Sequence, residues 1–228
     1  MSALTHPYPG SPPGDIIVLV AGDVSMAPVV DALGDVAVGA ISKGVQAFPL
    51  DVSMSIFSVG TDAFPGKLPS PTLKNYLVNP PPMGVGAPAG QVKEHDPVTP
   101  PPDYNYDMEN AIIDACALFD WRNGTKQAIL LLANEWPNGG GQAAGTSILA
   151  DVKTAARYKD KNPVLVFTGL TPPPTNKTLS KDVATEYRNL ALSGGTYTDL
   201  TVPSSLDTRI SDVIQRMIGA LAMAWKSH

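Results

Sequence analysis

Cysteine and charged side chains are scarce in this sequence. Of its 228 residues one is a cysteine, and only 16% are charged. A lone cysteine cannot form an internal disulfide, so the fold does not depend on an oxidising compartment. Cys116 lies within an apolar helical pattern, where we expect it to pack as a small buried hydrophobic residue.

Clusters of basic residues are also missing. The formal net charge is −5, and lysine and arginine are scattered along the chain. Binding to a phosphate backbone requires concentrated positive charge, so this composition argues against a nucleic-acid partner.

Long apolar runs do not occur either. The apolar runs have the length of strands, which excludes a transmembrane helix. Residues 1–14 are rich in Pro, Gly and Ser and show no basic region followed by an apolar run, so we expect no signal peptide. These features predict a soluble protein that is cytoplasmic or assembled into a virion or phage-tail-like particle. Export without a cleaved signal stays open.

Strand-like and helix-like segments alternate along the chain. This alternation predicts an α/β fold, a doubly wound and mostly parallel central sheet flanked by helices. The expected strands are 16–20, 52–59, 128–133, 164–168 and 196–200. The expected helices, recognised by apolar residues spaced three and four apart, are 27–48, 108–118, 148–158, 181–192 and 210–225.

A proline-rich stretch at about 61–104 interrupts this regularity. Proline fixes φ and lacks an N–H donor, so its density here forbids helix and central strand. We interpret the stretch as an irregular insertion within a single domain over residues 15–228, preceded by a Pro/Gly-rich tail over 1–14. Long irregular loops in compact domains are usually functional, disordered or held by a partner.

The segment from Ile16 to Met26 is the most informative one. It reads as a buried strand that runs into a short polar loop, Gly22-Asp23-Val24-Ser25-Met26, followed by a long helix. Ligands of open α/β sheets bind at such carboxyl ends of strands. The loop resembles the Asp-x-Ser-x-Ser-Met motif of the von Willebrand factor A (vWA) family. Further similar segments follow in the family's order: Ile56-Phe57-Ser58 with Thr61-Asp62-Ala63, Ala128–Leu132, and Leu190–Tyr197 with its Ser193-Gly194-Gly195.

The resemblance implies a vWA fold, a role in protein–protein contact, and a Mg²⁺ site whose usual ligands are missing here. Ala21 takes the place of the first aspartate and Asp23 that of the first serine. The threonine position falls at Tyr106 or Met108, the last aspartate becomes Asn134, and Ser25 alone is unchanged. Mg²⁺ is a hard cation that needs anionic oxygen ligands, so we expect no standard metal site.

Two interpretations of the remaining polar residues stay open. A rearranged metal site would use Asp23, Ser25 and Glu135, with Asp107 nearby. Alternatively, these residues are loop caps, because Asp23 and Ser25 suit the start of one helix and Asp107 the start of another. Trp136 follows on the same expected face and is a candidate anchor for a partner.

An enzymatic function has weak support. Gly140–Ser147 follows a strand and opens a helix, as a phosphate-binding loop does, but Thr146 stands where that loop has its lysine. A flexible turn that ends in a helix cap accounts for this segment better. No Gly-x-Ser-x-Gly elbow is present.

The sequence therefore predicts a non-enzymatic interaction or structural subunit of a larger protein assembly. Its contacts would come from the face around Asp23, Ser25, Asp107, Asn134, Glu135 and Trp136, and no cofactor is expected. The alternatives are a ligand-binding vWA domain that uses Mg²⁺ at the rearranged site and, with less support, a nucleotide-binding α/β enzyme.

Overall fold

A computed structural model describes residues 4–6, 10–21, 24–59, 108–119, 121–134, 136–137, 149–157, 162–171, 181–202 and 205–227. The described residues form one six-stranded sheet in the order β1-β3-β2-β4-β5-β6. The strands are β1 (Leu4–His6), β2 (Pro13–Ala21), β3 (Asp51–Val59), β4 (Lys126–Ala133), β5 (Leu165–Leu170) and β6 (Tyr197–Asp199). The helices are the short 3-10 turn η1 (Val24–Met26), α1 (Ala27–Ala47), α3 (Met108–Leu118), α4 (Leu149–Arg157), α5 (Lys181–Leu190) and α6 (Leu206–Lys226).

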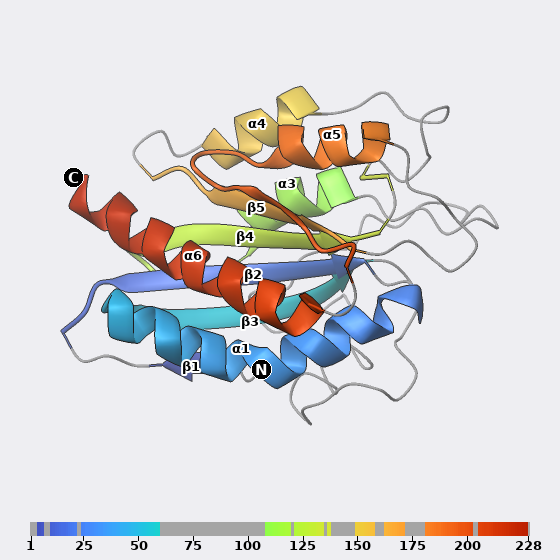
Figure 1. The fold of residues 1–228 in the computed structure, drawn as a ribbon. Coiled ribbons are helices and arrows are strands. Elements are labelled where there is room, and N and C mark those ends of the chain that lie inside the picture. Colours follow the sequence, from blue (N-terminus) through green and yellow to red (C-terminus); the bar gives the residue numbers. More distant parts are fainter. Residues whose placement is uncertain are drawn as a thin grey trace, which may run out of the picture.

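Helices cover both faces of the sheet (Figure 1). Helices α1 and α6 lie side by side on the front face, while α3, α4 and α5 belong to the opposite layer. Five strands, from β3 to β6, run parallel, and β1 alone pairs antiparallel with β3. The fold is thus the doubly wound α/β arrangement that the alternation of strands and helices predicts.

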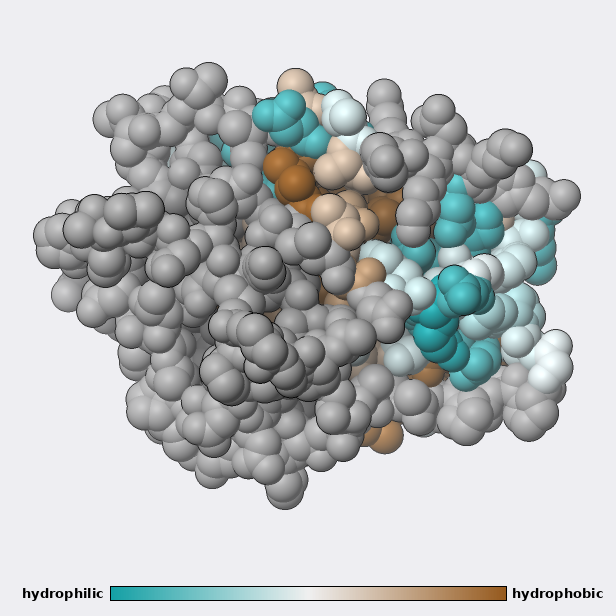
Figure 2. Space-filling model, turned by 180° about the vertical axis from the view of Figure 1, so that it is seen from behind, coloured by the Kyte–Doolittle hydropathy of each residue, from teal (hydrophilic) through white to brown (hydrophobic). Residues whose placement is uncertain are grey.

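The reverse face carries apolar as well as polar surface. Figure 2 shows brown apolar side chains that reach the surface between polar groups on this side. Half-buried apolar residues of the reverse layer include Ile113 and Cys116 in α3 and Leu149 in α4, all packed against the core. Cys116 is therefore half-buried, and it forms no disulfide.

The central strands are buried throughout, as near-continuous apolar runs predict. All eight residues of β4 and all but the first residue of β2 are buried. Their register pairs Gly14 with Lys126 and Val20 with Leu132, so the two strands begin and end together. The loops that follow Ala21 and Ala133 consequently leave the sheet at neighbouring points of its carboxyl edge.

The front helices pack closely because glycines line their contact. A Cβ atom added at Gly44 of α1 would lie 2.5 Å from Ile218 Cδ1 of α6, and one added at Gly219 would lie 3.1 Å from the Phe48 ring. The strongest apolar stripe of the sequence, in α6, is thereby placed against α1 and over the sheet.

The predicted elements are all present, with ends that shift by a few residues. Differences concern mainly strand starts: β2 begins at Pro13 and β4 at Lys126, because backbone pairing continues beyond the apolar run. Sequence patterns do not predict strand β1, because the Pro/Gly-rich composition of residues 1–14 indicates a tail. The proline-rich stretch at about 61–104 lies outside the described residues.

Steric constraints explain the glycines in the segment before β6. Ser193 and Gly194 adopt left-handed conformations, with φ of 56° and 98°. Leu192 pairs with Val166, and a Cβ atom on Gly195 would lie 1.9 Å from the Val166 carbonyl oxygen. This turn brings the chain back to β5 and starts the edge strand β6.

We predict that Gly195→Ala destabilises the protein, by about 1–3 kcal/mol, because backbone must move to relieve the clash. Gly39→Ala is the matched control, since Gly39 lies in α1 with open space around it. Alanine there favours the helix by about 0.5–1 kcal/mol. Chemical denaturation of both variants measures the difference, and equal stabilities would contradict the steric account.

Candidate functional site

The polar loops at the carboxyl edge of the sheet meet through one short contact. Asn134 directly follows β4, and its Nδ2 donates a hydrogen bond of 2.6 Å to Ser25 Oγ in η1. Asn134 is fully buried, with 0% exposure, while Ser25 is half-buried. Among the described residues, Asn134 Oδ1 has no hydrogen-bond partner. The structure thus brings together two of the residues that sequence reasoning selects.

A threonine supports this contact from the next strand. Thr171, directly after β5, donates from its backbone N–H (2.9 Å) and its hydroxyl (3.1 Å) to the Ala133 carbonyl. Its hydroxyl also lies 3.2 Å from the Met26 sulfur. Met26 and Thr171 are both fully buried. The loops after β2, β4 and β5 are therefore joined beneath the surface of this edge. Sequence patterns cannot identify this role of Thr171, because its partners lie 38 and 145 positions away in the chain.

Trp136 lies just beyond Asn134 on the same edge. Its side chain is half-buried and packs against the core. The neighbouring Pro137 carbonyl accepts a hydrogen bond of 3.1 Å from the Glu109 N–H in the first turn of α3. This bond ties the loop after β4 to the start of α3, so Trp136 presents part of its ring from an anchored position.

Ser25 is not the N-cap residue of α1. The N-cap residue of α1 is Met26, which makes no side-chain cap, and proline occupies the first turn. Ser25 lies instead within η1, where its hydroxyl faces Asn134. Asp23, Asp107 and Glu135 lie outside the described residues, so the rearranged site that includes them stays a prediction. Among the described residues, no three His, Cys, Asp or Glu side chains gather as a metal site would require.

The described part of this edge does not fit Mg²⁺. With bonds of 2.0–2.1 Å, ligand atoms on neighbouring corners of an octahedron lie about 2.9 Å apart. The Ser25 and Asn134 atoms are closer than this, at 2.6 Å, and one of them is an amide nitrogen. Ala21, buried at the end of β2, offers no oxygen from its side chain. A neutral hydrogen bond thus joins the loops directly.

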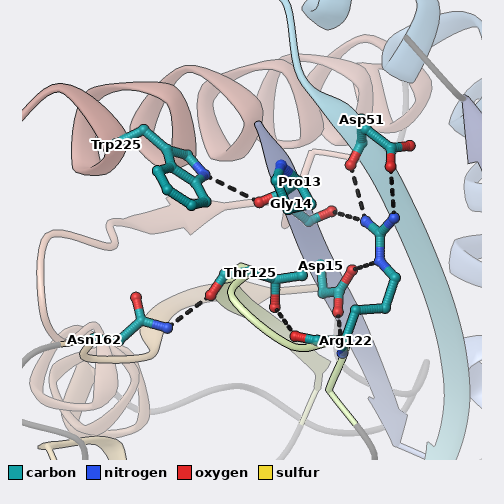
Figure 3. Close-up of polar contacts among 8 residues, drawn as sticks. All are labelled: Pro13, Gly14, Asp15, Asp51, Arg122, Thr125, Asn162 and Trp225. Carbon is teal, nitrogen blue, oxygen red and sulfur yellow. Dashed lines mark hydrogen bonds and ion pairs between the residues drawn. The ribbon is translucent and has the colours of Figure 1, made fainter. Parts of the chain in front are cut away.

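The strongest polar network lies at the opposite, amino edge of the sheet (Figure 3). Arg122, in the turn before β4, donates from Nε to Asp15 Oδ1 at 2.6 Å and from Nη1 to Asp51 Oδ2 at 2.8 Å. Its Nη2 donates to the carbonyls of Gly14 and Asp51, and its backbone N–H donates to Asp15 Oδ2. We call these four residues the Arg122 clamp.

The charged groups of the Arg122 clamp pair with one another. Burial lowers the pKa of Arg122, but the hydrogen bonds and charges of Asp15 and Asp51 outweigh it, so the pKa is raised overall. Asp15 is only 3% exposed, and a carboxylate buried so deeply needs this cation. Both carboxylates are paired, and the arrangement is structural rather than a reactive site. The partners lie 71 to 108 positions from Arg122, and no sequence pattern identifies them.

The C-terminal helix closes the same edge. Trp225 of α6 donates from Nε1 to the Pro13 carbonyl at 3.0 Å, and the Lys126 ammonium lies 5.5 Å from its ring centroid. Burial lowers the pKa of Lys126. Trp121 is buried and donates to the Ala115 carbonyl at 3.2 Å. Both tryptophans therefore serve packing.

Taken together, the sheet order and the covered faces define a doubly wound α/β domain with a closed, neutral contact at its carboxyl edge. No protein-family model and no curated protein sequence matches the chain. None of the described helices has the length and apolar character needed to cross a membrane.

Several solved structures share the fold at low sequence identity. The pilus adhesin SpaC from Lactobacillus rhamnosus GG matches 93% of this chain with a TM-score of 0.53 and 11% identity. The proximal thread matrix protein 1 from the mussel byssus matches 91% of it, with a TM-score of 0.54 and 10% identity. The PilB minor pilin from Streptococcus sanguinis matches 95%, with a TM-score of 0.51 and 10% identity. The matches cover 31%, 47% and 64% of those chains, so this chain spans only part of each.

We predict that Arg122→Met destabilises the protein by about 2–3 kcal/mol, because it leaves Asp15 buried without its cation. This loss of stability is smaller than that for a fully buried ion pair, because the Arg122 side chain is 38% exposed. The double variant Asp15→Asn with Arg122→Met should recover part of the loss. Chemical denaturation of the four proteins of this cycle tests the claim, and strictly additive losses would show that the pair does not interact.

Proposed function

We propose that this chain is a vWA-like interaction or structural subunit of a larger protein assembly, and that it acts without a bound metal ion. Its contact surface is the loop face around Asp23, Ser25, Asp107, Asn134, Glu135 and Trp136, in which buried Asn134 supports the surface from beneath. The observation that carries the proposal is the direct hydrogen bond from Asn134 to Ser25. In the family that the sequence resembles, a Mg²⁺ ion would join these two loops.

The direct hydrogen bond between Asn134 and Ser25 supports a contact surface that is already formed before a partner binds. A metal-dependent face changes with ion occupancy, whereas here buried Asn134, Thr171 and Met26 hold the loops together in the chain itself. A preformed surface loses less conformational entropy when a partner binds. Trp136, half-buried beside it, is the kind of large aromatic residue that dominates binding energies.

The similar structures support the same kind of role. Their names describe a pilus adhesin, a minor pilin and a thread matrix protein. At about 10% identity they share only the fold, and fold alone does not determine function. We therefore take them as support for assembly in general, and we propose no enzymatic activity. A virion or phage-tail-like particle is one form that such an assembly takes.

We predict that the metal site can be restored. The double variant Ala21→Asp with Asn134→Asp supplies carboxylates at the two positions where the family has them, next to Ser25. Its melting temperature should rise with Mg²⁺, since ligand at about 100 times Kd stabilises by about 2.7 kcal/mol. The wild-type protein should show neither heat in titration calorimetry nor a thermal shift with Mg²⁺, Mn²⁺ or Ca²⁺.

Two controls sharpen this metal test. Ala21→Asn adds similar bulk without charge and should not respond to Mg²⁺. Asn134→Asp alone separates the effect of the second carboxylate if the double variant folds poorly. Metal binding by the wild-type protein would overturn the proposal in favour of the rearranged site with Asp23, Ser25 and Glu135.

We predict that Trp136→Ala weakens assembly. The wild-type chain, isolated from its native source, should elute with partner proteins and show a mass above that of one chain in light scattering. Trp136→Ala should reduce that mass because it removes the aromatic anchor of the loop face. Val38→Ser is the control, since Val38 lies 58% exposed on α1, on the front layer.

Thermal unfolding should show that both variants fold, so that a change of mass reports on contacts. A wild-type chain that remains monomeric in native extracts would contradict the assembly role. Retention of the full mass by Trp136→Ala would place the contact elsewhere on the molecule.

A further inference from the structure

Strand β6 is the last strand of the sheet that the described residues form, and the direction of its backbone groups can be derived. In a parallel ladder, alternate residues direct both their N–H and C=O groups to the same neighbour. Thr168 N–H donates to the Thr196 carbonyl, and Leu200 N–H donates to the Leu170 carbonyl, so Thr196 and Leu200 face β5. By the same alternation Thr198 faces β5, while Tyr197 and Asp199 direct their backbone groups away from the sheet.

Most of these outward groups have no partner in the part of the chain that the structure describes. The Asp199 carbonyl accepts a hydrogen bond from Arg209 Nη1, which confirms that it points away from β5. The Tyr197 N–H, the Tyr197 carbonyl and the Asp199 N–H have no partner among the described residues. Such a row of backbone groups is a template for an added strand.

Arginines flank this edge on the front face. Arg216 of α6 donates from Nη2 to Thr198 Oγ1 at 2.8 Å and from Nη1 to Thr196 Oγ1 at 3.5 Å. Arg209, two helical turns earlier, reaches the strand through its bond to Asp199. These bonds hold the two guanidinium groups beside β6 while leaving further N–H donors on each, since a guanidinium has five.

A third arginine lies on the reverse face. Tyr197 pairs with Thr168, whose hydroxyl donates to the Tyr187 carbonyl of α5, so the Tyr197 ring lies on the α5 side. Arg188 of α5 stacks on this ring at 4.7 Å from its centroid. The stacking holds the Arg188 guanidinium beside the strand edge. Arg188 and Arg216 are exposed and Arg209 is half-buried.

The charge at this edge is not neutralised within the described chain. None of the three arginines forms an ion pair with a described carboxylate. Two acids lie near these arginines. Asp199 is on the strand, and its Oδ1 already accepts the Thr201 N–H at 2.9 Å and the Thr201 hydroxyl at 2.6 Å. These bonds, aided by the charges of Arg209 and Arg188, lower the Asp199 pKa. Asp212 lies on α6 between Arg209 and Arg216, and its carbonyl accepts from Arg216 Nε at 3.4 Å. Three cations against these two carboxylates leave a positive edge on a chain of net charge −5.

We propose that the β6 edge binds an acidic extended segment of a partner protein, which adds to the sheet as a further strand. Backbone bonds would form with Tyr197 and Asp199. Successive side chains of a strand point to opposite faces, so carboxylates of the segment would meet Arg188 on one face and Arg209 and Arg216 on the other. Charge complementarity selects the acidic partner, because bonds between guanidinium and carboxylate are the strong, geometrically defined ones.

This surface is separate from the loop face of the proposed function. The residues involved come from β6, α5 and α6, and none belongs to the loop face. A chain that fails to bind acidic segments can still assemble through Trp136, and a chain that fails to assemble through Trp136 can still bind them. The two proposals therefore fail independently.

The test uses a labelled peptide, Val-Glu-Glu-Val-Glu-Glu-Val, whose strand form carries carboxylates on both faces. Fluorescence anisotropy with the full chain should show binding at low salt that weakens roughly tenfold at high salt, because exposed charges are screened. The same peptide with glutamine in place of glutamate should not bind. Hydrogen exchange should show the Tyr197 and Asp199 amides becoming protected when the acidic peptide binds.

Matched variants separate the arginines from overall charge. Arg188→Gln, Arg209→Gln and Arg216→Gln together should weaken binding roughly tenfold or more. Lys43→Gln in α1, Lys153→Gln in α4 and Lys226→Gln at the far end of α6 together remove the same charge away from β6, and should leave binding within about twofold. Arg188→Gln alone preserves the α6 bonds to β6 and provides a milder variant if the triple change unfolds the edge.

Three results would overturn the proposal. The first is no binding of the acidic peptide at low salt. The second is binding that leaves the Tyr197 and Asp199 amides unprotected, which would indicate attraction without strand addition. The third is protection of these amides in the free protein together with a dimer that the triple arginine variant dissociates, which would make a second copy the occupant.

Discussion

One guanidinium group aligns the strands of this protein. Arg122 reaches β2, β3 and the turn before β4 at once, through Gly14, Asp15 and Asp51. Parallel strands are joined by long crossovers, so no tight turn sets the relative position of their starts. The buried Asp15 carboxylate is stable only with the cation in place, and the cation in turn determines where the strands begin. With their starts aligned, the ends of β2 and β4 meet at the far edge, where Ser25 and Asn134 come into contact.

The carboxyl edge of the sheet is held together by neutral hydrogen bonds. Parallel α/β sheets place loops from several strands at this edge whatever those loops contain. Here an amide, a hydroxyl and a threonine-to-carbonyl bond join the loops directly. The one unpaired acceptor among them, Asn134 Oδ1, is buried at the centre of the contact.

Sequence patterns identify this fold well because its elements are long and its central strands are continuous apolar runs. The period of α6 and the run Ala128–Leu132 each lead directly to the correct element. Sequence patterns also place Ser25 and Asn134 together at the carboxyl edge of the sheet. Patterns miss β1, three residues whose pairing with β3 depends on partners about 48 positions away. They miss the Arg122 clamp and the arginines beside β6 for the same reason, since these contacts join residues that the sheet order alone brings together.

The contact between Trp225 and Pro13 has a mechanical meaning. It holds the last helix to the start of the first long strand, so these two points of the chain lie together at the amino edge. A stretching force applied at Trp225 and Pro13 would first break the contact between them and then separate α6 from α1 one helical turn at a time. The parallel strands would not be sheared against one another at first. The glycine-lined helix pair, rather than the sheet, would therefore yield first under tension.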